Sequence, residues 1–400
     1  MNRPESRNRA EGGARIVIGI VAMVLAVAAC GGGASSGGGS KTPYAIAYVA
    51  DLTGGNSANS LGGQAGFNTA LKEINDSGGV NGHKLQVQTY DSQSDVNAFQ
   101  AQLRQALGTN PMAISGQWLS GSNSAAVSIF NSANVAVVTA AYSVTGVDTI
   151  PYWLSTSPLG PGVGKGAVNG VKAVLGGSLS GKKVAFEGLN SPAVDANLAA
   201  IKSQVEADGG SMGMVVRDPI SFSSWSSQAA NMAASKPDAV VVNNTDGNNT
   251  TVVKALAVAG LNVPVVATEG ANSDQMLAAV SSPNFYAVRE HNEPAAGSKV
   301  YKDAISGGAT VDQINQSYFG KMYAAAYIIS NTLAKCGSPC DGTKFASTLT
   351  SLGKITIPND VLLGPVDFSK SHAGLTTAQI WAWDTANKKS IPKGATFPII

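Results

Sequence analysis

The chain has 400 residues, which is too long for one ordinary hydrophobic core and suits about two domains. Hydrophobic residues make up 44% of it and charged residues only 13%, so we expect packed cores beneath a surface rich in Ser, Thr, Asn and Gln. Residues 1–29 contribute the whole formal net charge of +2, and the neutral remainder has no electrostatic attraction to nucleic acid.

The first residues of the chain have the pattern of an export signal. Four arginines precede the apolar run Ile16–Ala29, which is shorter than the ~20 residues that a membrane-spanning helix needs. Small residues then lead into Cys30 and a Gly/Ser-rich segment, an arrangement that resembles the bacterial lipoprotein signal. Residues 1–29 are therefore predicted to be a lipoprotein signal peptide, and residues 30–42 a lipidated Cys30 followed by a flexible tether. An ordinary signal peptide with an incidental cysteine is the alternative.

From residue 43 onward, short apolar strands alternate with amphipathic helices. Strands are predicted at Tyr44–Val49, Leu85–Tyr90, Met112–Ser115 and Val135–Val138. Helices are predicted at Gly62–Asn75, from Asp95 to about Leu107, and between the last two strands. This alternation predicts a parallel sheet with right-handed crossovers.

Polar loops follow the last two of these strands. Gly116–Asn123 comes after the third strand and Thr139–Ser143 after the fourth. The carboxyl ends of parallel strands share one edge of a sheet, where helix N-termini and free backbone N–H groups gather and ligands bind. We expect these loops to form half of a solute-binding cleft, and a second, similar set of loops to form the other half.

After an extended crossing at Pro151–Pro158, the same pattern begins again. Strands are predicted at Lys183–Phe186, Met212–Arg217, Ala239–Val242, Leu261–Ala267 and Phe285–Val288. Helices are predicted at Val163–Leu175, Pro192–Ala207, Trp225–Ala234 and Thr250–Ala259, the last after a polar loop at Asn243–Asn249. Pro111 and Pro237 stand at matching points of the two series. The repetition predicts two lobes of the same topology.

The rest of the chain is predicted to connect and complete the lobes. It contains a second crossing at Arg289–Pro294, helices at Pro294–Ser306, Tyr318–Lys335 and Thr343–Leu352, and a strand at Ala378–Asp384. The expected fold is α/β, with two Rossmann-like, doubly wound parallel-sheet lobes joined by a multi-strand hinge. The N-terminal lobe would comprise residues 43–154 and 290–365, and the C-terminal lobe residues 155–289 and 366–400.

Cys336 and Cys340 lie close together in the sequence, and an exported chain favours a local disulfide between them. A metal site is not expected because no second Cys or His pair is near, and the spacing is not that of a Cys-x-x-Cys redox pair. His83 and His372 are expected at the surface; His291 lies in a predicted crossing and could touch a ligand, but contact with solvent is the favoured interpretation. No catalytic motif is present in the sequence, so we expect neither an enzyme nor a cofactor.

Several segments resemble the type I periplasmic binding proteins, specifically the leucine/isoleucine/valine-binding branch that serves ABC importers. The resemblance covers about residues 44–390. Its motifs are Leu52–Gly54, Asn75–Leu85, Tyr90–Ser92, Gly116–Ser122, Thr139–Ser143, Thr268–Gly270 and Gly364–Val366. It implies the two-lobed fold, a small-molecule ligand and an ABC permease as partner.

The resemblance also implies roles for individual residues. Ser120 matches the serine that binds an amino acid's carboxylate, and Ala141 matches a residue whose carbonyl faces the ammonium group. Ser143 matches a threonine that touches both groups, and Glu269 matches a second-lobe carboxylate that pairs with the ammonium. Hydroxyl and N–H donors suit a carboxylate, whereas carbonyl and carboxylate acceptors suit an ammonium.

The chain departs from the family where the ligand's side chain would be recognised. Tyr142 stands where relatives have a small residue, and Trp118 precedes the serine loop. For both, ligand contact and core packing are open, whereas Trp153 and Trp225 are expected in the core. Asn190, Ser191 and Asn243–Asp246 stand where relatives often place aromatic residues, so we expect a polar or aromatic amino acid, an amide or an aromatic acid. The predicted ligand-binding residues are Trp118, Ser120, Gly121, Ser122, Ala141, Tyr142, Ser143, Asn190, Asn244, Asp246 and Glu269.

These observations predict a receptor that is lipid-anchored to the outer face of a bacterial cell membrane and delivers a small polar ligand to an ABC importer by cleft closure. A receptor of the same fold that reports its ligand to a signalling partner is one alternative, and an exported hydrolase is another. Contact with the membrane is expected through the lipid anchor only, and contact with nucleic acid is not expected.

Overall fold

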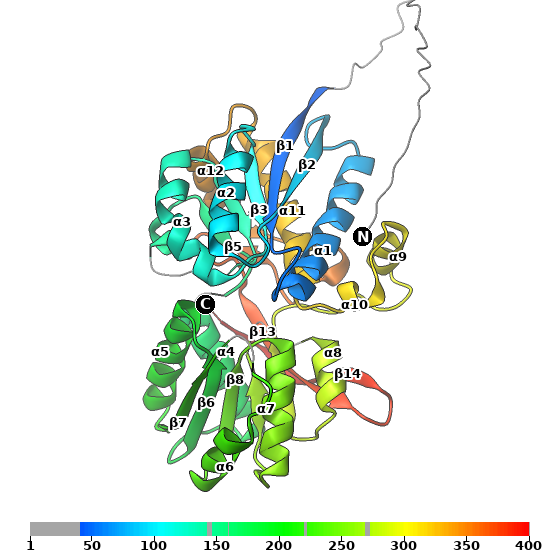
Figure 1. Cartoon of the computed structure of the whole chain (residues 1–400). Helices are drawn as coiled ribbons and strands as arrows, with labels where there is room; N and C mark the ends of the chain where they lie inside the picture. Colours follow the sequence, from blue (N-terminus) through cyan, green and yellow to red (C-terminus); the bar gives the residue numbers. More distant parts are fainter. Residues whose placement is uncertain (1–40, 142–145, 159, 220–221, 269–272, 400) are drawn as a thin grey trace, which may run out of the picture. The chain divides into compact units, whose positions relative to one another are not determined.

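Two large β-sheets form the frame of the protein in a computed structural model (Figure 1). The structure describes residues 41–141, 146–158, 160–219, 222–268 and 273–399. Four residues to which the sequence assigns a function lie outside the described residues, and these are Cys30, Tyr142, Ser143 and Glu269.

The first sheet has the strand order β2-β1-β3-β4-β5, and all neighbouring strands are parallel. Its strands are β1 (Lys41–Ala50), β2 (His83–Asp91), β3 (Ala113–Gly116), β4 (Ala136–Thr139) and β5 (Trp153–Ser155). Ile114 on β3 and Val137 on β4 are fully buried. Short apolar runs form the buried strands β3 and β4 because apolar side chains pack well in a sheet that is covered on both faces.

Helices cover both faces of the first sheet. On β1, Ile46 and Tyr48 belong to the core beneath α1 and α11, whereas Ala47 and Val49 belong to the core beneath α2 and α3. These helices are α1 (Ser57–Asp76), α2 (Val96–Leu107), α3 (Ser120–Ala133) and α11 (Tyr318–Cys336). We call this sheet, these four helices, α9 (Lys299–Ser306), α10 (Val311–Ile314) and α12 (Gly342–Leu352) the first lobe.

The second sheet has the order β14-β13-β10-β9-β8-β6-β7. The pairs β10–β13 and β13–β14 are antiparallel, and the other neighbouring pairs are parallel. Its strands are β6 (Lys183–Leu189), β7 (Ser211–Asp218), β8 (Ala239–Asn243), β9 (Val265–Ala267), β10 (Phe285–Arg289), β13 (Thr377–Asp384) and β14 (Lys389–Pro398). With α4 (Gly160–Val174), α5 (Pro192–Ala207), α6 (Ser226–Ala234), α7 (Asp246–Val258) and α8 (Asp274–Val280), it forms the second lobe.

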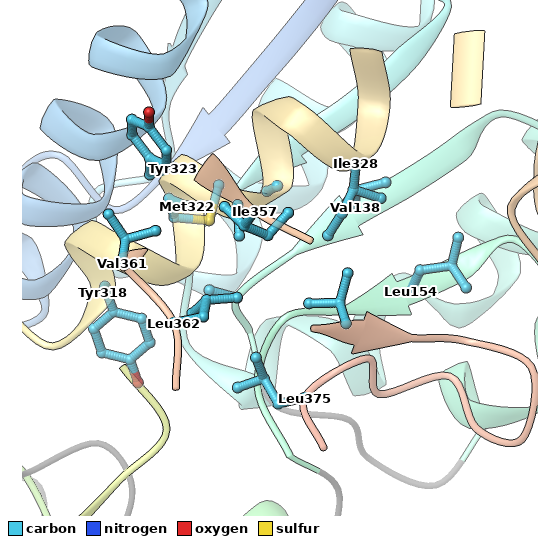
Figure 2. Packing of buried hydrophobic residues seen from close by; sticks show 14 of the residues in the cluster. Val138, Leu154, Tyr318, Met322, Tyr323, Ile328, Ile357, Val361, Leu362 and Leu375 are labelled. Carbon is cyan, nitrogen blue, oxygen red and sulfur yellow. The ribbon is translucent and has the colours of Figure 1, made fainter. Parts of the chain in front are cut away.

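The chain passes between the two sheets after β5, after β10 and before β13. Backbone hydrogen bonds join the segment before β13 to the end of β5 and to the crossing after β10. The N–H of Gly374 donates to the carbonyl of Ser155 at 3.0 Å, and the N–H of Leu363 donates to the carbonyl of Glu290 at 3.0 Å. Leucines of the crossing regions, including Leu362 and Leu375, belong to the same buried cluster as Val138 of β4 (Figure 2).

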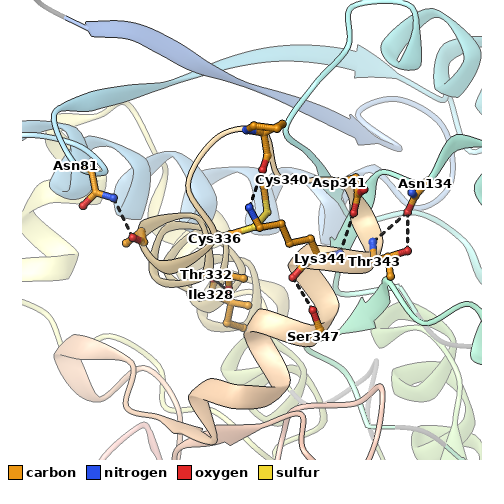
Figure 3. Close-up of a disulfide and its surroundings, with 12 residues drawn as sticks. Asn81, Asn134, Ile328, Thr332, Cys336, Cys340, Asp341, Thr343, Lys344 and Ser347 are labelled. Carbon is orange, nitrogen blue, oxygen red and sulfur yellow. Dashed lines mark hydrogen bonds between the residues drawn. A yellow bond between two sulfur atoms is a disulfide. The ribbon is translucent and has the colours of Figure 1, made fainter.

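Cys336 and Cys340 are joined by a disulfide that links the end of α11 to the start of α12 (Figure 3). Asp341 is the N-cap of α12, and its side chain accepts a hydrogen bond from the N–H of Lys344 at 2.8 Å. The side chain of Asn134 accepts a hydrogen bond from the N–H of Thr343 at 3.0 Å, which fastens α12 to the end of α3.

The predicted α/β fold with two parallel-sheet lobes is confirmed, but several element boundaries are wrong. Residues 120–123 are the first turn of α3 and residues 246–249 the first turn of α7, although both stretches are predicted as loops. The predicted crossing at Pro151–Pro158 contains strand β5. The prediction also lacks several elements, among them the short helices α8 and α10, which Ser273 and Thr310 cap, and the edge strand β14.

His291 is 1% exposed, so the prediction that it contacts solvent is wrong. It lies in the crossing after β10, next to the buried side chains of Arg289 and Glu290. Burial lowers the pKa of its imidazole well below 6.5, and the charges of Lys321 and Arg289 act in the same direction. The imidazole is therefore neutral at physiological pH.

Trp153 and Trp225 are buried, as the sequence predicts. The helices among the described residues are all too short or too polar to cross a bilayer. Within the same residues, no group of three or more His, Cys, Asp or Glu side chains is arranged to hold a metal ion.

Candidate functional site

A cavity is lined by residues of both lobes. The first lobe contributes Asn56, Asn59, Gln117, Trp118, Leu119, Ser120 and Tyr318. The second lobe contributes Leu189, Ser191, Ala193, Val194, Asn197, Asn243, Asn244 and Thr245. Most of these residues follow the carboxyl ends of β1, β3, β6 and β8, which is the edge where α/β proteins bind ligands.

The carboxylate of Asp51 connects the loops on the first-lobe side of this cavity. Its Oδ1 accepts hydrogen bonds from the hydroxyl of Ser92 at 2.6 Å and the N–H of Ser94 at 3.2 Å. Its Oδ2 accepts hydrogen bonds from the side-chain amide of Asn56 and from the N–H of Leu119, both at 2.9 Å. One fully buried carboxylate thus fixes the segments that follow β1, β2 and β3 relative to one another.

Ser120 is the first residue of α3 and lines the cavity. Gly121 and Ser122 follow it on the same helical turn, and Ser122 is buried. The first N–H groups of a helix have no partner within the helix and carry a partial positive charge. This turn can therefore bind a carboxylate or another anionic group through backbone N–H groups and the Ser120 hydroxyl.

Trp118 lines the cavity but is only 1% exposed. Its indole N–H donates a hydrogen bond to Oδ1 of Asn123 at 2.7 Å. Its ring packs with those of Phe99 and Phe130, at centroid distances of 5.0 and 6.4 Å. Most of its surface therefore stabilises the core of the first lobe.

Asn244 is buried at the end of β8 and forms part of the second-lobe side of the cavity. Its side-chain amide donates a hydrogen bond to Oε1 of Glu187 at 2.7 Å. Burial raises the pKa of Glu187 to about 8; the hydrogen bond from Asn244 lowers it and the charge of Asp218 raises it. Glu187 is therefore a largely protonated carboxyl group behind the cavity wall at neutral pH.

Asp246 lines a second space that adjoins the cavity at Asn56, Asn59 and Thr245. Its Oδ2 accepts a hydrogen bond from the hydroxyl of Ser273 at 2.6 Å. Burial raises the pKa of Asp246 to about 6, although the Ser273 hydrogen bond and the charge of Arg289 lower it.

The structure brings only some of the predicted residues to the cavity. Trp118, Ser120 and Asn244 line it, and Asp246 lines the adjoining space. Ala141 does not line it, and its carbonyl accepts a hydrogen bond from the Ser155 hydroxyl at 2.9 Å. Asn190 is exposed outside the cavity lining.

Several lining residues are absent from the sequence prediction. Gln117 lies within the polar loop that the sequence singles out, and Asn56 follows β1, whose carboxyl end lies at the same edge of the sheet. The rule that ligands bind at the carboxyl ends of parallel strands could therefore have identified both residues. Asn197 on α5 and Tyr318 on α11 carry no local signal in the sequence, because only the tertiary fold brings these helices to the cavity.

The family model described as periplasmic binding protein matches residues 43–388. No sequence among the curated proteins matches the chain. Among solved structures, a fatty acid ABC transporter substrate-binding protein from Thermomonospora curvata is similar, with a TM-score of 0.74 and 18% identity over 89% of this chain and 92% of that one.

Two further structures illustrate the range of ligands bound by proteins of similar fold. The branched-chain amino acid transporter substrate-binding protein LivJ from Streptococcus pneumoniae, in complex with isoleucine, has a TM-score of 0.71 and 18% identity over 89% of this chain and 99% of its own. A solute-binding protein of an ABC transporter from Rhodopseudomonas palustris, in complex with 3,4-dihydroxybenzoic acid, has a TM-score of 0.73 and 18% identity over 90% of this chain and 98% of its own. At this identity the likeness shows the fold.

Proposed function

This chain belongs to the periplasmic binding protein family, and on that premise we propose that it is an extracytoplasmic receptor that delivers a small polar solute to an ABC importer. The observation that supports the proposal is a cavity that both lobes line, mostly with residues at or after the carboxyl ends of their strands. A ligand that contacts Ser120 of the first lobe and Asn244 of the second stabilises the state in which these residues line one cavity.

The ligand we propose is an amino acid or a related amide or aromatic acid. In this proposal Ser120 and the first turn of α3 bind its carboxylate, together with Gly121 and Ser122. Ser143, the carbonyl of Ala141 and the carboxylate of Glu269 bind its ammonium group. Hydrogen bonds to charged groups are worth ~1.5–3 kcal/mol each, so a few of them suffice to hold such a head group. Tyr142, Asn190 and Asp246 are proposed to surround the remainder of the ligand.

We also propose that Cys30 carries a lipid and anchors the receptor at the outer face of the cell membrane. The support is the pattern of basic residues, apolar run and small residues that precedes Cys30. The Cys30→Ala variant should leave the membrane fraction and lose labelling by a radioactive fatty acid. Labelling that persists in this variant would contradict the assignment.

A thermal-shift screen of the mature chain against amino acids, amides and aromatic acids tests the receptor function. At least one compound should raise the melting temperature, because a ligand that binds only the folded state stabilises it. For a compound that binds and has an ammonium group, Glu269→Gln should weaken binding at least tenfold. Glu206→Gln, at an exposed position of α5, should leave binding unchanged. Unchanged binding in Glu269→Gln would remove the ammonium role from Glu269.

A further inference from the structure

Three buried polar side chains form a relay that ends at the cavity. Oδ2 of Asp51 accepts a hydrogen bond from Nδ2 of Asn56 at 2.9 Å, and the same nitrogen lies 3.0 Å from Oε1 of Gln117. That Oε1 also accepts a hydrogen bond from the hydroxyl of Ser60. Asp51, Asn56 and Gln117 are 0%, 6% and 3% exposed, and the last two line the cavity.

The relay determines which end of the Gln117 amide is free. Oδ2 of Asp51 accepts a hydrogen bond from the backbone N–H of Leu119, and we take the same oxygen as the acceptor toward Asn56, so the amide group of Asn56 that faces it is its NH₂. The atom of Gln117 that faces this NH₂ must then be its carbonyl oxygen. Among the described residues, none accepts a hydrogen bond from Nε2 of Gln117. Gln117 therefore has an unused N–H donor in a side chain that lines the cavity.

The second lobe supplies an acceptor to the same cavity. Asn197 on α5 is 3% exposed, and its Nδ2 donates a hydrogen bond to Oδ1 of Asn243 at 2.9 Å. Its Oδ1 accepts no hydrogen bond from the described part of the chain. A donor from the first lobe and an acceptor from the second therefore line one cavity, beside the apolar side chains of Leu189 and Val194.

We propose that this cavity selects an amino acid with a carboxamide side chain. The carboxamide oxygen accepts a hydrogen bond from Nε2 of Gln117, and the carboxamide NH₂ donates one to Oδ1 of Asn197. The inference rests on the proposed function, which supplies the amino-acid head group, and it adds the class of side chain. An aliphatic side chain would leave both protein groups without hydrogen-bond partners, and it should therefore bind more weakly than a carboxamide.

Charge supports the same class of ligand. Every described residue that lines the cavity is uncharged, so an ionised ligand side chain would find no counterion among them. Transfer of an unpaired charge out of water is strongly unfavourable. A carboxamide has the shape of a carboxylate without its charge, and the cavity should therefore prefer L-glutamine to L-glutamate as well as to L-leucine.

Calorimetric titration of the mature chain with L-glutamine, L-leucine and L-glutamate tests this proposal. The wild-type protein should bind L-glutamine at least tenfold more tightly than either of the others. Gln117→Leu should bring the glutamine and leucine affinities to within about threefold of each other. Gln117→Glu keeps the shape of the side chain but replaces the donor with an acceptor, and should weaken glutamine binding at least tenfold.

Gln105→Leu, on the exposed surface of α2, makes the same change outside the cavity and should leave the wild-type preference intact. Circular dichroism and the melting temperature establish that each variant is folded. A wild-type protein that fails to prefer L-glutamine overturns the proposal, even if it binds another amino acid and so retains its receptor function. A preference that survives both Gln117 variants also overturns it. Failure of every amino acid, amide and aromatic acid to bind would count against the receptor function itself.

Discussion

The backbone nitrogen of Leu119 lies 2.9 Å from Oδ2 of Asp51, so a carboxylate at the end of β1 holds the residue that precedes α3. Leu119 is the N-cap of α3, and its side chain makes no hydrogen bond to the first N–H groups of the helix. Ser120, the next residue, lines the cavity. The position of the first-lobe binding residues therefore depends on Asp51, which does not itself line the cavity.

Asp51→Asn should weaken ligand binding and destabilise the protein. Among the described residues, four groups donate hydrogen bonds to this side chain, and an asparagine would turn its NH₂ toward two of them. We expect the free energy of unfolding, measured by urea denaturation, to fall by about 1–3 kcal/mol. Ligand affinity, measured by calorimetry on the folded variant, should fall at least tenfold because the Asn56 and Gln117 amides lose their fixed orientation.

Asp95→Asn is the matched control for this substitution. Asp95 is the exposed N-cap of α2, where its side chain accepts a hydrogen bond from the N–H of Ala98 at 2.8 Å. Asparagine caps helices about as well as aspartate, so both stability and affinity should stay near the wild-type values. Wild-type affinity in folded Asp51→Asn would show that Asp51 does not position the binding residues.

The parallel sheets of both lobes could be predicted because their strands are short apolar runs between amphipathic helices. Val135–Val138 and Ala239–Val242 carry this signal in a few residues, and both form buried strands. The start of α3 could not be predicted in the same way. Ser, Gly and Asn are weak helix formers that favour loops, yet Ser120–Asn123 form a helical turn that the Asp51–Leu119 contact holds at its N-terminal end.

The crossing after β10 shows a second limit of the sequence. A run that contains Arg289, Glu290 and His291 suggests a surface segment, because charged residues are seldom buried without partners. In the structure Arg289 pairs with Asp274, and Glu290 lies 3.5 Å from Nζ of Lys321, a residue of α11 that is distant in the sequence. The burial of this segment depends on these long-range pairs, which no local pattern reveals.

Arg289→Met should destabilise the protein strongly. The guanidinium of Arg289 is fully buried, lies 2.7 Å from Oδ1 of Asp274 and packs over the ring of Trp381 at 5.3 Å. Removal of one partner of a buried ion pair typically costs about 3–5 kcal/mol, and because the side chain of Asp274 is 26% exposed we expect a loss near the lower end of this range. Urea denaturation should show that the free energy of unfolding falls by this amount. Arg104→Met, at an exposed position of α2, should change it by less than about 0.5 kcal/mol. Similar losses in both variants would contradict this account.

The double variant Cys336→Ala/Cys340→Ala should be less stable than the wild type. The disulfide closes a short loop between α11 and α12, and the chain-entropy relation for a loop of this size gives about 2 kcal/mol. A reducing agent should lower the denaturation midpoint of the wild-type protein toward that of the variant and leave the variant unchanged. A midpoint that responds equally to the reducing agent in both proteins would show that the effect does not come from this disulfide.

Glu187 should make the protein less stable as pH rises. Burial raises the pKa of its carboxyl group in the folded state to about 8, from an ordinary value of 4.5. Below pH 4.5 both states hold the proton, and between 4.5 and 8 only the folded state does, so folding takes up a proton in that window. The free energy of unfolding then falls with pH, by at most about 1.4 kcal/mol per pH unit for one proton. Above pH 8 this contribution is constant.

Glu187→Gln isolates that contribution because glutamine resembles the protonated carboxyl group and keeps an oxygen for the Asn244 amide, which donates to Oε1 of Glu187 at 2.7 Å. Urea denaturation at several pH values between 5 and 8 should show the variant gaining stability relative to the wild type as pH rises. Glu206→Gln removes a carboxylate from the exposed face of α5 and provides the matched control for loss of charge. A stability difference between Glu187→Gln and wild type that is the same at pH 5 and pH 8 would mean that Glu187 is ionised in the folded protein throughout this range.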